Sequence, residues 1–130
     1  MTDITSKEDI VSFVDQFYND IQADDLIGPI FLGKIKNDEW PVHLEKMYSF
    51  WNSVLFGQSD YRGNPFSHHI SLGLEKNHFD RWIALFTKTI TDNFQGPKAS
   101  EAIIRAGKMR LLFESKLAHI KANPNSKRIL

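Results

Sequence analysis

The histidines are the side chains of this sequence best suited to chemistry. There are five in 130 residues. His68 and His69 are adjacent, His78 follows within ten residues, and His43 lies in the segment before them. Imidazole works at neutral pH as a base, a proton donor or a metal ligand. We therefore ask first whether one of these imidazoles holds a metal ion or a cofactor.

A site for a small ion is one possibility, since His68, His69, His78 and Glu75 are close in sequence. Neighbouring residues on a helix point about 100° apart, so His68 and His69 rarely grip one ion together. The sequence contains no His-Glu-x-x-His zinc motif, no glycine-rich phosphate loop and no nucleophile elbow. Counting residues leaves a Ser/His/Asp arrangement open.

A haem site requires one neutral imidazole, an apolar slot and polar groups opposite the axial ligand. His69 is the candidate iron ligand, on the expected inner face of a short helix. Tyr18, His43 and Trp82 are candidate polar groups for the opposite side. The candidate walls are Phe17, Phe31, Met47, Trp82, Phe86, Met109 and Phe113. A dense core explains the 12% aromatic content equally well, so spacing alone leaves both explanations open.

Apolar residues recur every three or four positions, which predicts an all-α domain of four long and two short helices. We expect Thr5 to cap the first helix in a capping box with Glu8, and Asp38 to cap the third. The expected long helices run from about 6 to 23, 39 to 56, 75 to 93 and 98 to 121, and the short ones lie within 26–32 and 66–72. We expect a single domain over 1–130, with its core at about 6–122 and a flexible tail at 123–130.

Composition narrows the classes of partner. Sixteen basic residues balance sixteen acidic ones, so we expect no nucleic-acid binding. No apolar run is long enough to span a membrane, and the amino terminus lacks a secretory signal, so we expect a cytoplasmic monomer. The absence of cysteine excludes disulfides, a thiolate nucleophile and covalent haem attachment through Cys-x-x-Cys-His.

Several segments, taken in order, resemble truncated haemoglobins, specifically their third group. The matching pieces are Phe17-Tyr18, Leu26 to Phe31, Glu39-Trp40 with His43, Phe50-Trp51 with Leu55, Asp60 to His69, and Phe79-x-x-Trp82-x-x-Leu85-Phe86. The resemblance covers about Ile10 to Phe113. The glycine pairs typical of the other two groups are absent, which agrees with the third group.

The resemblance implies a two-over-two helical sandwich that binds haem b without a covalent link. It implies His69 as the proximal iron ligand, with His68 a solvated bystander. It places Tyr18, His43 and Trp82 in the distal pocket, where His43 could also ligate the iron. Phe31 would reach the haem face and Met47 the wall above it.

The implied ligands are O2, NO and CO. Three polar groups would retain bound oxygen for redox chemistry such as removal of nitric oxide or peroxide, with electrons from a separate reductase. The alternative is a cofactor-free helical interaction module.

Overall fold

The computed structural model describes residues 1–57 and 74–122, with side chains described up to residue 119, and every regular element in those ranges is helical. The predicted all-α class is therefore confirmed. The helices are α1 (Lys7–Ala23), α2 (Gly28–Lys34), the 3-10 turn η1 (Asn37–Glu39), α3 (Trp40–Phe56), α5 (Lys76–Asn93) and α6 (Pro97–Ala122). Among these helices, none is long and apolar enough to cross a membrane.

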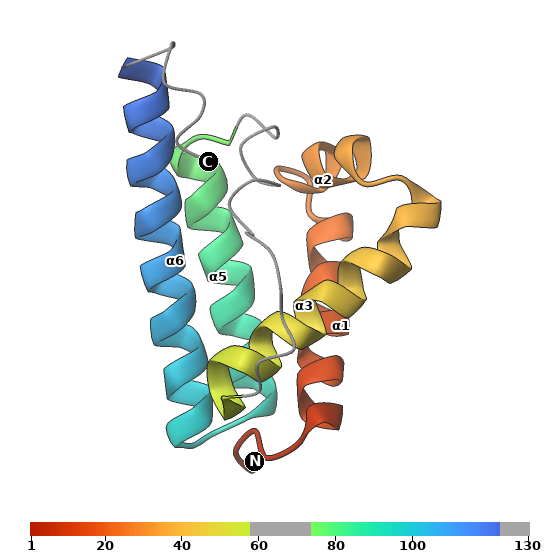
Figure 1. The fold of residues 1–130 in the computed structure, drawn as a ribbon. Coiled ribbons are helices and arrows are strands. Elements are labelled where there is room, and N and C mark those ends of the chain that lie inside the picture. The colour runs from red at the N-terminus through yellow and green to blue at the C-terminus, as the bar shows by residue number, and fades with distance from the viewer. Residues whose placement is uncertain (58–73, 123–130) are drawn as a thin grey trace.

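The helices form two pairs. Figure 1 shows α3 crossing α1, while α5 and α6 run side by side in opposite directions. Helix α1 packs against α2, α3 and α5, so it joins the two pairs. Phe13 of α1 illustrates this role, since its ring meets Trp51 of α3 and Phe86 of α5 edge-on. Candidate site residues carried by α1, α3 and α5 consequently converge on one core.

Helix α1 has the predicted buried face, but its cap is one residue later than expected. The N-cap is Ser6, whose hydroxyl accepts a hydrogen bond from the Asp9 amide at 3.3 Å. The Asp9 carboxylate accepts in turn from the amide of Thr5 at 2.9 Å. The predicted capping box of Thr5 and Glu8 is wrong, because Ser6 is the N-cap and the Asp9 side chain, rather than that of Glu8, accepts from the Thr5 amide.

Helix α3 also begins differently from the prediction. Residues Asn37–Glu39 form a 3-10 turn, the N-cap of α3 is Glu39, and no side chain caps it, so the predicted Asp38 cap is wrong. Pro41 lies in the first turn, as expected, where its missing N–H costs nothing. At the other end, Gly57 adopts a left-handed conformation with φ of 70°, which ends the helix.

The amino-terminal arm closes the fold at the foot of α6. The carboxylate of Asp3 accepts hydrogen bonds from the amides of Lys98 and Ala99 at 2.9 and 2.8 Å. Next to it, Ile4 is 1% exposed and belongs to the main core. The first turn of α6 has no acidic residue of its own, so Asp3 supplies the negative charge that a helix N-terminus favours.

Candidate functional site

The aromatic pair Phe17 and Tyr18 lies at the centre of the candidate site. Both rings are buried, and their centroids lie 5.1 Å apart. Neighbouring residues on a helix diverge, so Phe17 can face α5 while Tyr18 faces α3. Phe17 accordingly meets Trp82 at 5.8 Å, while Tyr18 meets residues of the first turns of α3.

Tyr18, Trp40 and His43 form a compact three-ring cluster, which we call the Tyr18 cluster. The ring centroids of Tyr18 and His43 lie 5.0 Å apart and nearly perpendicular. Trp40 lies 5.8 Å from Tyr18 and 5.6 Å from His43. Trp40 and His43 are close because residues three apart share one face of a helix. The structure thus brings two of the predicted polar groups, Tyr18 and His43, into contact.

Trp82 is the third predicted polar group, and it reaches the same region from α5. Its ring is 8% exposed, and its indole N–H is buried without a hydrogen-bond partner in the part of the chain described. The indole N–H of Trp40 is in the same situation. Burying a donor without a partner costs about 1–3 kcal/mol, so both indole N–H groups are available to an acceptor that the described residues do not supply.

The predicted wall residues separate into two groups. Phe17, Phe31, Met47, Trp82 and Phe86 are buried in the main core. Phe113 instead belongs to a second cluster with Leu74 and Phe79. Met109 is half-buried and packs against both groups, so it connects them. The predicted apolar lining is therefore buried except at the half-buried Met109, and it is divided between two clusters that Met109 joins.

The remaining histidines differ in what they do. His68 and His69 lie outside the described residues, so the predicted iron ligand stays a prediction. His78 is half-buried and accepts a hydrogen bond at Nδ1 from the Glu75 amide at 2.9 Å. His119 is exposed on α6. The residues described contain no group of three or more His, Asp or Glu side chains that could hold a metal ion. The small-ion alternative stays untested, because two of its candidates, His68 and His69, lie outside those residues.

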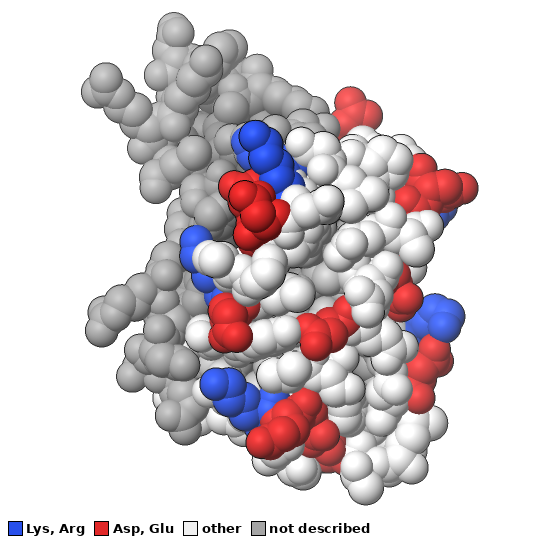
Figure 2. Space-filling view, turned by 90° about the vertical axis from the view of Figure 1, so that its right-hand side faces the viewer, with Lys and Arg blue, Asp and Glu red and all other residues white. Residues whose placement is uncertain are grey.

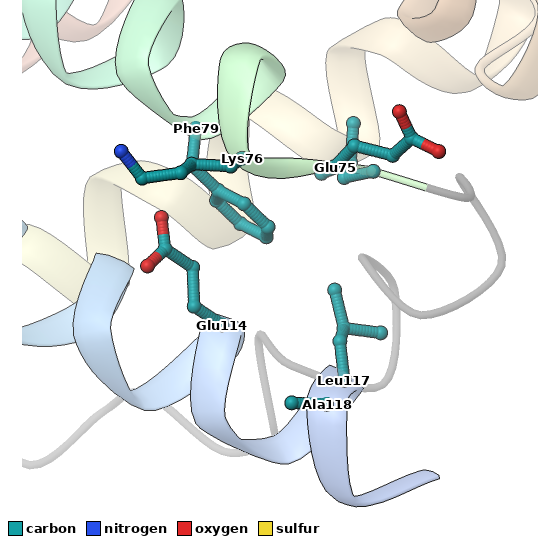
Figure 3. Close-up of a pocket in the computed structure, with 7 residues that line it drawn as sticks. Glu75, Lys76, Phe79, Glu114, Leu117 and Ala118 are labelled. Atoms are coloured by element: carbon teal, nitrogen blue, oxygen red, sulfur yellow. The ribbon is translucent and has the colours of Figure 1, made fainter. Parts of the chain in front are cut away.

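A groove of about 180 Å³ opens between the first turn of α5 and the distal part of α6. Figure 3 shows Phe79 pointing into it, with Leu117 and Ala118 on the α6 side. Glu75, Lys76 and Glu114 lie around it, so both signs of charge are present. None of the predicted polar groups or wall residues lines this groove, and it is distinct from the Tyr18 cluster.

Comparison with known proteins agrees with this arrangement of helices and rings. The family model of the bacterial-like globins matches residues 2–112. This chain is a bacterial-like globin of the group III truncated haemoglobins. The group 3 truncated hemoglobin ctb of Campylobacter jejuni is 32% identical over 88 residues, which cover 65% of this chain and 69% of that protein. The crystal structure of the group III truncated hemoglobin from Campylobacter jejuni superposes with a TM-score of 0.81 at 28% identity, covering 90% of this chain and 95% of that one.

Membership of this family makes the protein a haem-binding globin with the two-over-two sandwich. The residues present fit such a group. The two buried indole N–H groups need an acceptor, and the rings around them offer the apolar surface that a flat macrocycle requires. A cofactor-free interaction module does not account for either feature.

Trp40 is the residue of this region that sequence reasoning missed. The helical pattern placed it on the apolar stripe of α3, and the structure confirms that it is buried. Its indole N–H and its contacts with Tyr18 and His43 make it a member of the cluster as well. Its position three residues before His43 was the available signal.

Proposed function

We propose that this globin binds haem b without a covalent link and that His69 is its proximal iron ligand. The absence of cysteine supports non-covalent binding, since it excludes thioether attachment. The choice of His69 is supported by the Gly-x-Pro sequence before it and by the contacts and exposure of the other described histidines. His78 caps α5, His119 is exposed, and His43 lies in the Tyr18 cluster.

The Tyr18 cluster and Trp82 then form the distal side of the pocket. When bound, the haem iron supplies an open axial position for a diatomic ligand such as O2, NO or CO. The observation that carries this proposal is the buried indole N–H of Trp82, which has no hydrogen-bond partner among the described residues. The centroid of the Trp82 ring lies 5.8 Å from that of Phe17, the residue before Tyr18. A diatomic ligand with partial negative charge is the acceptor that this donor lacks.

The distal side chains would hold the ligand by hydrogen bonds. The hydroxyl of Tyr18 and the indole N–H of Trp82 donate, and burial of both rings keeps water from competing. A hydrogen bond to a charged group is worth about 1.5–3 kcal/mol, and every 1.4 kcal/mol changes a rate or affinity about tenfold. Two such bonds therefore slow ligand escape by about 100-fold or more. Slow release suits chemistry on the bound ligand better than oxygen delivery.

His43 has a second possible role in this proposal. It lies at the edge of the cluster, half-buried, and its Nε2 is buried. A neutral imidazole in this position can act as a proton donor to a ligand or occupy the open axial position in the resting protein. The absorption spectra of the ferric and ferrous forms distinguish five-coordinate from six-coordinate iron and decide between these roles.

The redox function we propose is turnover of nitric oxide or peroxide. Any such cycle consumes electrons, and the 130 residues contain no glycine pattern for a flavin or a nicotinamide nucleotide. The electrons would then come from an external donor, such as a separate reductase. The proposal follows from the expected retention of bound oxygen, because a site that releases oxygen slowly gives a second reactant time to arrive.

The test is the rate of oxygen dissociation, measured by stopped flow on the ferrous protein. We expect Trp82→Phe and Tyr18→Phe each to release oxygen about 10-fold faster or more, since each loses one charge-assisted bond. Phe94→Leu is the matched control, because it also truncates a buried ring but lies against Phe13, away from the cluster. Unchanged rates in both distal variants would refute ligand retention.

A further inference from the structure

Tyr48 and Asp15 form a hydrogen bond between α3 and α1 that the haem site does not require. The phenol O–H of Tyr48 donates to a carboxylate oxygen of Asp15, and both side chains are half-buried. Burial, the hydrogen bond to Asp15 and the charges of Asp15 and Glu45 all raise the pKa of Tyr48. The phenol therefore keeps its proton at neutral pH while a base already touches that proton.

Three stacked rings lead from α3 to Trp82, and the first of them lies three residues from Tyr48 along α3. Trp51 lies three residues after Tyr48, on the same face of α3. The Trp51 ring stacks on Phe86 with centroids 5.0 Å apart and planes inclined by 17°. Phe86 in turn stacks on Trp82 at 6.0 Å and 14°. All three rings are buried, so the stack runs through the dry core from α3 to the candidate ligand site.

These two features together have the parts of an electron relay. Tryptophan and tyrosine are the side chains most readily oxidised by one electron, and closely stacked rings pass electrons between them. A neutral tyrosine gives up an electron far more easily when its proton can move to a base at the same time. Asp15 is within hydrogen-bonding reach of that proton, as a proton acceptor must be.

We propose that Tyr48 is the terminal redox residue of this protein, oxidised through Trp51 and Trp82 when hydrogen peroxide reacts at the haem. This rests on the proposed function, since it assumes peroxide chemistry there. Peroxide takes two electrons and two protons and yields two waters. The haem group, when bound, would supply both electrons, and the two protons would come from solvent. Tyr48 returns one of them along the stack, its O–H bond breaks, and its proton passes to Asp15, leaving a neutral tyrosyl radical beside a carboxylic acid.

A one-electron donor in solution completes the cycle. It reduces the tyrosyl radical, and the proton returns from Asp15 to the phenolate oxygen. A second donor molecule reduces the remaining oxidising equivalent in the same way. Tyr48 is half-buried, so a donor need not enter the distal pocket to react.

The charges around Tyr48 indicate the class of donor. Helix α1 carries four acidic residues and one basic one, Lys7, and Glu45 acts on Tyr48 from α3. Figure 2 shows patches of Asp and Glu side chains, with Lys and Arg side chains between them, on the face of the molecule away from α5 and α6. Neutral or cationic donors, such as aromatic amines, are favoured here over anionic ones.

Electron paramagnetic resonance of the ferric haem protein, frozen rapidly after mixing with hydrogen peroxide, tests the relay. We expect a tyrosyl radical in the wild type and loss of that signal in Tyr48→Phe. Tyr61→Phe is the matched control and should keep it. Trp51→Phe preserves a stacked ring but is harder to oxidise, and Asp15→Asn keeps an acceptor oxygen but cannot take the proton. Both should lower the yield of radical.

A radical that persists in Tyr48→Phe, or an undiminished yield in Asp15→Asn, would overturn the proposal and leave the pair a structural hydrogen bond. The Soret band recorded in the same samples separates this failure from failure of the proposed function. If the band responds to peroxide but no Tyr48 radical forms, only the relay is wrong. If the Soret band does not respond to peroxide, the proposed peroxide chemistry is wrong. The relay is then tested by photo-oxidising the same haem protein with a ruthenium sensitiser, and absence of a Tyr48 radical in that experiment overturns the relay.

Discussion

The guanidinium of Arg81 lies 2.6 Å from the carboxylate of Asp24, and this contact fixes the residue before Trp82 to the end of α1. The other oxygen of Asp24 accepts from the amides of Leu26 and Ile27 at 3.0 and 2.9 Å, where the chain turns into α2. One largely buried carboxylate therefore holds α1, the turn into α2 and α5 in register. The relative position of Tyr18 and Trp82 depends on that register.

Loss of this carboxylate should destabilise the fold in a pH-dependent way. Burial would raise the pKa of Asp24, but the bonds from Ile27, Arg81 and Leu26 outweigh it and hold the pKa below the ordinary 3.8. The folded state thus gains stability from the ionised group that is complete above pH 3.8 and is lost as the pH falls through the lower folded value. We expect Asp24→Asn to lower the free energy of unfolding by about 1–3 kcal/mol at neutral pH.

Urea titrations at several pH values measure this difference. The difference in unfolding free energy between the wild type and Asp24→Asn should become smaller in acid, as the wild-type carboxylate takes up its proton. Asp25→Asn is the matched control, since Asp25 lies 3.3 Å from Arg81 but its side chain is 95% exposed. Its effect should stay within about 0.5 kcal/mol. An equal loss in both variants would show that Asp24 acts only as a surface charge.

Asp3 should make a second acid-sensitive contribution at the other end of the molecule. Burial opposes ionisation, but the backbone bonds from Lys98, Ala99 and Ile4 prevail and lower the pKa of Asp3. Its stabilisation is likewise present at neutral pH and lost in acid. Because Asp3 caps α6 from a distance, we expect Asp3→Ala to cost about 1 kcal/mol by thermal or urea unfolding at neutral pH. Glu8→Ala, at an exposed position, provides the comparison and should be near neutral.

Gly28 should not tolerate a side chain. A Cβ at this position would lie 2.8 Å from the Gln22 carbonyl oxygen and 2.9 Å from that of Ile21, and backbone atoms cannot move aside cheaply. Gly28→Ala is therefore expected to push α2, which carries Phe31, away from α1 and to lower the melting temperature by several degrees, which is about 1 kcal/mol or more for a domain of this size. Gly33→Ala meets nothing within 4 Å and should be neutral or stabilising by up to about 1 kcal/mol. Similar melting temperatures for the two variants would mean that the close approach of α1 and α2 is not needed.

The two adjacent histidines should differ sharply in haem retention. We expect the wild-type protein, purified from haem-sufficient cells, to be red, and His69→Ala to lose most of its haem, because the axial bond to iron is removed. His68→Ala should keep it. Hemin titration followed at the Soret band measures both affinities. Equal losses would mean that the wrong imidazole was chosen, and a wild type that takes up no hemin would contradict haem binding altogether.

The sequence by itself determined the helical class, the approximate bounds of the helices and the family, because apolar spacing and the ordered motifs are local properties of the chain. It also indicated that Phe17, Trp82 and Phe86 face inward. Its capping predictions at Thr5 and Asp38 failed, since several nearby side chains compete for the same amides and small differences in geometry select one of them.

Only the tertiary structure decided which side chains meet. Tyr18 and His43 belong to different helices, and their perpendicular contact depends on how α3 crosses α1. The unpartnered state of the Trp82 indole and the bond between Tyr48 and Asp15 are likewise relations across helices. Sequence periodicity shows which face of a helix is buried, but which residue lies opposite depends on the packing of the whole core.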